Sequence, residues 1–180
     1  MLTPDRRPIA LIGLMGAGKS AVAQSLGERL GVSVVDLDRM IESIEGCTVA
    51  ELFERAGEPW FRRREGELLV DALGSGVRVV ACGGGVVLDP THRQLLRARC
   101  HVVWLEVSPE EAARRVLDAA GGDPARTRPL LAGGAPEERL RALLAERQPL
   151  YAEAAHHRIV TTGQTPGEVA VAVLAALAAA

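Results

Sequence analysis

The stretch GLMGAGKS at residues 13–20 decides how the rest of the chain is interpreted. It fits the pattern G-x-x-x-x-G-K-[ST], in which glycines let the backbone bend around phosphates with its N–H groups pointing inward. In that pattern the lysine, here Lys19, reaches the β- and γ-phosphates, and the hydroxyl of the serine, here Ser20, binds magnesium. The stretch therefore predicts a loop that binds the phosphates of a nucleotide.

The residues on both sides of this loop support the prediction. Residues 8–13 (PIALIG) form a short apolar run that ends in glycine, which predicts a buried strand. A helix is predicted over about residues 18–30, with Gly31 as its C-cap, and the positive end of that helix would face the phosphates. The alternative is a glycine turn beside an unrelated Lys-Ser pair, and the order of strand, loop and helix argues against it.

The rest of the chain continues to alternate between strands and helices. Four more strands are predicted, at residues 32–37, 77–82, 101–107 and 158–162. Helices are predicted to begin at Thr48 (a capping box with Glu51), after Pro59, at Asp89-Pro90, at Ser108-Pro109, at Pro136 and near Thr165-Pro166. Strands that alternate with helices predict a parallel sheet covered on both faces, which is an α/β fold of three layers, α/β/α.

Composition limits the kind of protein. With 180 residues, of which 48% are apolar, the chain has the size and the apolar content for one domain with its own core. Aromatic residues make up 3%, so that core must be built from Ala, Val and Leu. The formal net charge is -2, whereas proteins that coat nucleic acids carry a strong basic excess. We therefore expect a single domain over residues 1–180 and no nucleic-acid partner.

The cysteines and the two ends of the chain indicate the compartment. Cys47, Cys82 and Cys100 are odd in number and form no CxxC pair, so small buried side chains in a reducing compartment are expected, not a disulfide framework or a zinc site. No secretory signal opens the chain, and the apolar stretch at residues 169–180 is shorter than the ~20 residues that span a bilayer. A cytoplasmic protein without a membrane partner is expected.

Two acidic residues follow the second predicted strand. Asp36 and Asp38 flank one leucine at its end. In open α/β sheets, ligands bind in the crevice beyond the carboxyl ends of the strands. One aspartate could instead cap the next helix, which explains Asp38 equally well when it is taken alone. Two acids at this place predict a functional role for at least one of them.

Glycines after the third predicted strand offer a second place for a ligand. Gly83, Gly84 and Gly85 carry no side chains, so a ligand could meet bare backbone there; a flexible turn is the alternative. The segment at residues 118–135 is rich in glycine and alanine, has little periodicity and is too long for an ordinary connection. It is therefore predicted to be a functional loop or lid, in which Arg126 or Arg128 could close on the phosphates.

Arginines elsewhere are candidates for binding a second anion. Arg62, Arg63 and Arg64 are consecutive in a predicted helix, where neighbours point about 100° apart, so at most one is expected at a site and the others in solvent. Arg147 lies near the end of a helix, and taken alone it would be interpreted as a surface charge. The four histidines show no spacing typical of metal ligands.

Six motifs taken together resemble the shikimate kinase family. They are GLMGAGKS (13–20), DLDRMIE (36–42), FRRRE (61–65), GGG (83–85), TRPLL (127–131) and ERQPLY (146–151), in the family's order across nearly the whole chain. The resemblance implies a P-loop NTPase-like fold with a five-stranded parallel sheet, a mobile lid at about residues 118–135 and a shikimate-binding segment. It also implies the transfer of the γ-phosphoryl group of ATP to the 3-hydroxyl of shikimate, a step of aromatic amino-acid biosynthesis that gives shikimate 3-phosphate and ADP.

The resemblance implies roles for individual residues as well. Lys19, Asp38 and Arg128 are the implied catalytic residues, with Asp38 at the shikimate hydroxyls as the candidate proton acceptor and Arg128 over the phosphates. Ser20 and Asp36 are the implied Mg²⁺ ligands, Asp36 through water. The implied nucleotide contacts are Gly16, Ala17, Gly18, Lys19, Ser20, Ala21, Arg128 and Gln164. The implied shikimate contacts are Asp38, Gly83, Gly84 and Gly85, with Arg62 and Arg147 on the carboxylate.

Two other functions are compatible with the phosphate-binding loop. The first is a different small-molecule kinase, such as one acting on gluconate, although its acceptor site is not expected to combine DLD, FRR and GGG. The second is a nucleotide-binding switch or regulatory subunit without an acceptor, which should lack a second anion site. A monomer whose small-molecule partners are ATP and shikimate is the expectation that the resemblance favours.

Overall fold

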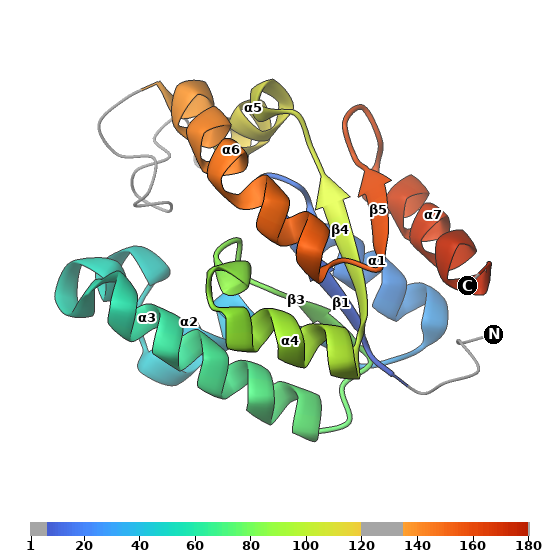
Figure 1. Cartoon of the computed structure of the whole chain (residues 1–180), viewed down its shortest axis with the longest axis horizontal. Coiled ribbons are helices and arrows are strands. Elements are labelled where there is room, and N and C mark those ends of the chain that lie inside the picture. The colour runs from blue at the N-terminus through green and yellow to red at the C-terminus, as the bar shows by residue number, and fades with distance from the viewer. Residues whose placement is uncertain (1–6, 120–134, 180) are drawn as a thin grey trace.

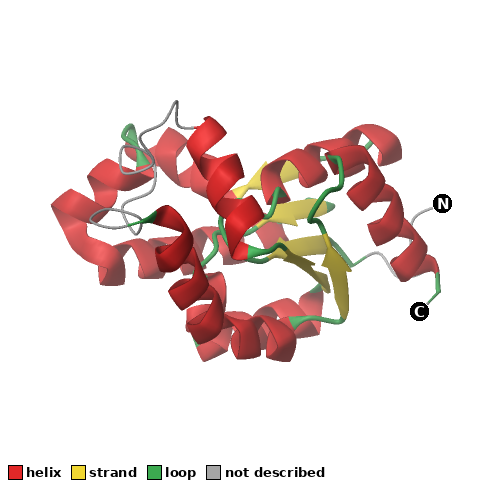
Figure 2. Cartoon of the chain, turned by 90° about the horizontal axis from the view of Figure 1, so that it is seen from above, coloured by secondary structure: helices red, strands yellow, loops and turns green. Residues whose placement is uncertain are grey.

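The computed structural model describes residues 7–119 and 135–179 and arranges them in three layers (Figures 1 and 2). The middle layer is a parallel sheet of five strands in the order β2-β3-β1-β4-β5. The strands are β1 (Ile9–Ile12), β2 (Val34–Asp36), β3 (Val79–Ala81), β4 (His101–Glu106) and β5 (His157–Val160). The predicted five-stranded α/β fold is confirmed.

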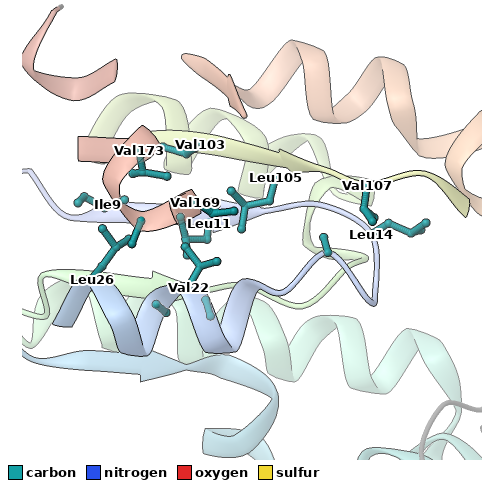
Figure 3. Close-up of a cluster of buried hydrophobic side chains, with 14 of the residues drawn as sticks. Ile9, Leu11, Leu14, Val22, Leu26, Val103, Leu105, Val107, Val169 and Val173 are labelled. Carbon is teal, nitrogen blue, oxygen red and sulfur yellow. The ribbon is translucent and has the colours of Figure 1, made fainter. Parts of the chain in front are cut away.

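The helices pack on both faces of the sheet and bury a core on each side. Along β1, Ile9 and Leu11 face one core, while Ala10 and Ile12 face the other, as the alternation of side chains along a strand requires. The first core lies against α1 (Lys19–Leu30) and α7 (Pro166–Ala178), whose side chains interdigitate with those of β1 and β4 (Figure 3). The second lies against α3 (Val49–Gly74), α4 (Pro90–Arg99) and α6 (Pro136–Ala154).

This arrangement places a crevice beyond the carboxyl ends of β1 and β3. The chain leaves β1 into α1, on the first face, and leaves β3 through a short 3₁₀ helix, η1 (Val86–Leu88), toward α4 on the second face. Because the two connections diverge, the loops at these strand ends are separated and can admit a ligand. The phosphate-binding loop and the glycines that follow β3 therefore border the same space.

Local capping explains why most helices begin where the sequence predicts. Thr48 and Thr165 each form a capping box with a glutamate three residues later, and the Asp89 carboxylate accepts a hydrogen bond from the N–H of Thr91. Gly31 ends α1 in the left-handed conformation with φ of 63°. The helix α5 (Pro109–Ala119) follows Ser108, whose hydroxyl accepts from a backbone N–H in the first turn.

The structure differs from the sequence expectation near the second strand. The helix α2 (Leu37–Glu45) starts directly after β2, and its cap is Asp36, whose carboxylate accepts from the N–H of Arg39 at 3.2 Å. The suggestion that Asp38 caps the next helix is therefore wrong; Asp38 lies within the first turn. The two helices predicted after Thr48 are both present within α3, on either side of a break at Gly57, where φ is 79°.

Two expectations about side chains and membranes can be compared with this fold. Cys82 and Cys100 are buried, Cys47 is half-buried, and all three are free thiols, as expected for small apolar side chains. Within residues 7–119 and 135–179, no helix is long and apolar enough to cross a membrane. Most of the predicted lid, including Arg126 and Arg128, lies outside the described residues.

Candidate active site

The phosphate-binding loop joins β1 to α1 in a conformation that only glycines adopt easily. Gly13, Gly16 and Gly18 have φ values of 140°, 80° and 87°. A Cβ atom on Gly16 would lie 2.6 Å from the carbonyl oxygen of Ala112, and one on Gly13 would collide with the carbonyl of Leu105. The glycines are thus needed both for the turn and for the close packing of neighbouring backbone.

Lys19 stands at the first position of α1 and reaches back over the loop. Its Nζ donates hydrogen bonds to the carbonyl oxygens of Gly13 at 2.8 Å and Leu14 at 3.0 Å. Ser20 follows in the first turn of the helix, which contains no acidic residue. A cation, a hydroxyl and the positive end of a helix therefore meet at one place, as phosphate binding requires.

A cavity of about 550 Å³ opens beside this loop and brings most of the predicted residues together. The members of the predicted set that line it are Gly16, Gly18, Lys19, Ser20, Ala21, Asp36, Asp38, Arg62, Gly84, Gly85 and Arg147. Three others of that set lie within the described chain but do not line this cavity: Ala17, Gly83 and Gln164. Arg128 lies outside the described residues.

Arg62 is the one member of the three-arginine run that lines the cavity. Its side chain is 18% exposed, and its guanidinium already has two carboxylate partners. Nε and Nη2 donate to Oε1 of Glu58 at 3.2 and 3.1 Å, while Nη1 donates to Oε2 of Glu65 at 2.8 Å. Arg63 is exposed, and Arg64 pairs with acidic residues on the outside of α3.

Glu65 is a functional candidate that sequence reasoning missed. Its side chain is fully buried, and its Oε1 has no hydrogen-bond partner in the described part of the chain. Burial raises the pKa of Glu65, although the neighbouring Arg62 opposes this shift. A Cβ atom on Gly83 would collide with that oxygen and would lie 3.0 Å from Oδ1 of Asp38. Gly83 therefore lies between two carboxylates, where a side chain would not fit.

Arg147 is buried, with 3% of its surface exposed, so its interpretation as a surface charge is wrong. The sequence could not show this, because the burial arises from the packing of α6 against η1 and α4. The Nε atom of Arg147 is buried without a hydrogen-bond partner among the described residues. One turn further along α6, the Tyr151 hydroxyl donates to the carbonyl oxygen of Gly84 at 2.6 Å.

Arg115 is a second missed residue, on the nucleotide side of the cavity. Its Nη1 donates to the carbonyl oxygen of Gly16 at 3.3 Å, and its Nη2 donates to that of Thr161 at 2.8 Å. Its Nε bonds to Glu111. Arg115 thus connects the phosphate-binding loop with the segment that follows β5. No motif marked it, because its role depends on α5 approaching both loops.

The cavity therefore has two chemically different ends. One end offers the glycine loop, Lys19 and Ser20 to phosphates, and the other offers Arg62 and Arg147, which both lie near Glu65, to a second anion. Asp38 lines the cavity as well, where it can accept a hydrogen bond from a hydroxyl group. This arrangement suits phosphoryl transfer from a nucleotide to a small acid that carries hydroxyls.

Comparisons with known proteins agree with this chemistry. The model of the shikimate kinase family matches residues 15–178. A curated shikimate kinase from Symbiobacterium thermophilum is 48% identical over 153 residues, which cover 85% of this chain and 86% of the relative. The solved shikimate kinase from Acinetobacter baumannii in complex with shikimate has a TM-score of 0.89 and 36% identity, covering 96% of this chain and 93% of its own.

A solved gluconokinase from Sinorhizobium meliloti also aligns with the chain, but more distantly. It has a TM-score of 0.56 and 20% identity, covering 97% of this chain and 93% of its own. At that level the likeness shows a shared fold alone. The fold therefore does not separate the two kinds of kinase, and the acceptor end of the cavity must do so.

Proposed function

The chain belongs to the shikimate kinase family and is an ATP-dependent kinase of that kind, and we propose how its cavity divides between the two substrates. The phosphates of ATP lie in the loop at residues 13–20, and shikimate lies at the end formed by Arg62, Arg147 and the glycines after β3. The γ-phosphoryl group then passes from one end to the other, onto the 3-hydroxyl of shikimate.

The observation that carries this division is the state of Arg147. A guanidinium is always charged, and a buried charge is costly unless it is paired. In the described chain the Nε of Arg147 is buried without a partner, which favours an anion as the missing ligand. The carboxylate of shikimate supplies that anion, and a planar carboxylate matches the fork of a guanidinium.

Arg62 contributes differently to the same carboxylate. Three of its hydrogen bonds already go to Glu58 and Glu65, so its charge is offset and its orientation is fixed before the substrate arrives. A side chain held in place loses little conformational freedom on binding. We assign to Arg62 the orientation of the carboxylate and to Arg147 most of the electrostatic attraction.

Asp38 is assigned to the reacting end of shikimate. An ionised carboxylate is a hydrogen-bond acceptor only, so it can hold hydroxyl groups and can take the proton that the 3-hydroxyl loses. Lys19 and the helix end offset the charge on the transferring phosphoryl group. Arg128 lies outside the described residues, and its role over the phosphates stays a prediction, as does the approach of Gln164 to the adenine.

The donors at the nucleotide end fit a magnesium ion. Mg²⁺ prefers oxygen ligands and usually binds through one or two protein groups together with water and substrate phosphates. The Ser20 hydroxyl and the Asp36 carboxylate are of this type, and the helix cap uses one oxygen of Asp36, Oδ1, leaving the second for a ligand or its water. When bound, Mg²⁺ neutralises phosphate charge.

A cytoplasmic location and a monomeric state also stay predictions.

The test is an assay of acceptor-dependent ADP release with ATP and Mg²⁺. Shikimate, gluconate and no added acceptor are compared at equal concentrations, with ADP measured by a coupled enzyme reaction. We expect turnover with shikimate and only background release in the other two reactions. Turnover with gluconate at the shikimate rate would refute the assignment of the acceptor, and acceptor-independent release equal to the full rate would refute a kinase.

A further inference from the structure

Tyr151 lies directly behind the glycines that line the acceptor end. It is the one tyrosine of the chain, its side chain is fully buried, and its ring stacks near that of Trp104 with centroids 5.9 Å apart. Its hydroxyl donates to the carbonyl oxygen of Gly84 at 2.6 Å. Burial raises the pKa of Tyr151 to about 12, so the hydroxyl keeps its proton and remains a donor at neutral pH.

The three carbonyl groups of the glycine loop are all held, but not in the same way. Those of Gly83 and Gly85 accept from backbone N–H groups three residues further on, at 3.1 and 3.0 Å, as part of the turn that η1 forms. The carbonyl of Gly84 accepts from the Tyr151 side chain, which belongs to a helix more than sixty residues away. The orientation of the central peptide thus depends on tertiary structure.

A trans peptide is planar, so its carbonyl and its N–H point in opposite directions. Gly84 and Gly85 line the cavity, whereas Tyr151 does not line it and belongs to a buried cluster. We propose that Tyr151 is a positioning residue for substrate: by holding the carbonyl of Gly84 on the core side, it turns the N–H of Gly85 toward the carboxylate of the acceptor. This inference rests on the proposed function of the acceptor end.

The position of Tyr151 on α6 couples two contacts to the same anion. Arg147 lies four residues earlier on the same face of the helix, and its side chain hydrogen-bonds with that of Tyr151, so neighbouring positions of α6 carry both the guanidinium and the hydroxyl that holds the loop. The loop has a second tie to this helix through Arg93. Its Nη1 donates to the carbonyl of Val87 at 2.7 Å, and its Nε donates to Glu153 at 3.0 Å.

The experiment compares the wild-type chain with Tyr151→Phe, which removes the hydroxyl and keeps the buried ring. Calorimetry measures the dissociation constants of shikimate, of a shikimate analogue without the carboxylate, and of ATP. Losing one hydrogen bond to a buried acceptor should raise the dissociation constant of shikimate about five- to tenfold. The constants of the analogue and of ATP should change by less than about twofold, because neither uses the N–H of Gly85.

A matched control is Glu153→Gln, two residues along the same helix, which weakens the tie to Arg93 and leaves the Tyr151 hydroxyl in place. It should keep the wild-type preference for the carboxylate. This preference is the ratio of the dissociation constant of the analogue to that of shikimate. The ratio stays the same if a variant only destabilises the fold. Incorporation of 4-aminophenylalanine at position 151 restores a donor and should recover most of the preference.

One outcome would overturn the positioning role of Tyr151, and a different outcome would overturn the carboxylate assignment. If Tyr151→Phe weakens shikimate and the analogue equally, or weakens neither, Tyr151 supports the fold alone and the positioning role is wrong. If wild type binds shikimate and the analogue equally well, the carboxylate assignment itself fails, whatever the variant does. Thermal melting of each variant, recorded beside the calorimetry, separates misfolding from both.

Discussion

The two ends of the cavity are built in opposite ways. The nucleotide end comes from one continuous stretch, residues 13–20, in which backbone N–H groups, a helix end and Lys19 follow directly from the order of residues. The acceptor end is assembled from α2, α3, the loop after β3 and α6, which are up to about a hundred residues apart. The first is local structure, and the second exists only once the tertiary fold has formed.

The charged groups at the two ends of the cavity are also held in different ways. At the nucleotide end the Lys19 ammonium is held by carbonyl oxygens of the loop itself. At the acceptor end, one guanidinium is offset by Glu58 and Glu65, and the other, that of Arg147, is buried with an unpartnered Nε among the described residues. If the proposed assignment holds, the comparison teaches that a short segment supplies the groups for phosphate binding, whereas the groups assigned to the acid are buried charges that the whole fold must hold.

The largest effect is expected at the local end. Lys19→Ala should lower kcat by about 10²- to 10³-fold or more, because it removes a positioned cation from the developing charge. The fold should stay intact, since both hydrogen bonds of Lys19 to the backbone of the described chain lie within the loop. Steady-state kinetics and circular dichroism measure the two properties. Arg29→Ala, which removes a cation from the other end of α1, is the control and should leave kcat unchanged; near-normal turnover in a folded Lys19→Ala protein would contradict the nucleotide assignment.

The second prediction separates the two arginines of the acceptor end. Arg147→Ala and Arg62→Ala should each raise the dissociation constant of shikimate by about one to three decades, the cost of truncating one partner of a buried charge pair. They should differ in stability. Arg62→Ala leaves Glu65 buried and unpaired, at a cost of up to about 3–5 kcal/mol in the free energy of unfolding, whereas Arg147→Ala removes a group that was itself short of a partner.

Calorimetry with shikimate and thermal unfolding measure these two effects. Lysine at either position should restore affinity in part, because it keeps the charge but loses the fork. ATP affinity should change little in all four variants. Equal loss of stability in Arg62→Ala and Arg147→Ala would remove the distinction between a guanidinium bonded to two carboxylates and one with an unpartnered Nε.

The third prediction concerns the glycine that separates two acids. Gly83→Ala places a methyl group against Oε1 of Glu65 and close to Asp38, so one of these side chains must move. Overpacking of this kind costs about 1–3 kcal/mol in the free energy of unfolding. Because the displaced side chain lies at the acceptor end, shikimate binding should also weaken and turnover should slow. Gly74→Ala is the control, because a Cβ atom there meets nothing within 4 Å, and it should leave activity unchanged. Similar kinetics in the two variants would show that the loop accommodates a side chain.

Much of the fold could be predicted because its signals are local. The caps at Thr48, Asp89 and Thr165 lie within three residues of the groups they bind, and the strands are apolar runs. The break near Gly57 was expected as the boundary between two helices, but the 3₁₀ turn after Gly85 was not predicted, because a glycine permits many conformations and packing selects one. Helix and strand existence therefore followed from the sequence more readily than the details between them.

The candidate site divides along the same line. The phosphate-binding loop could be predicted from its residues alone. Arg62 and Arg147 could be singled out only through a family resemblance, because nothing local distinguishes them from exposed arginines. Glu65 and Arg115 were missed altogether, since the burial of the first and the bridging contacts of the second arise when separate elements pack.

The smallest expected effect is a pH dependence confined to the acceptor end. Burial raises the pKa of Glu65, and a bound carboxylate nearby should raise it further, because it makes the ionised form still less favourable. The complex then holds more protons than the free enzyme between the two pKa values, so shikimate affinity should be higher at low pH and should fall as the pH rises from the raised pKa of Glu65 in the free enzyme through its still higher pKa in the complex. For one proton the slope is at most about tenfold per pH unit, and a shallower fall is expected because Arg62 opposes the shift. Calorimetry of shikimate without nucleotide, from pH 5 to 8, measures the slope, since the acid itself is ionised throughout this range. Glu65→Gln should flatten it, and a slope that persists in that variant would assign the titration to another group.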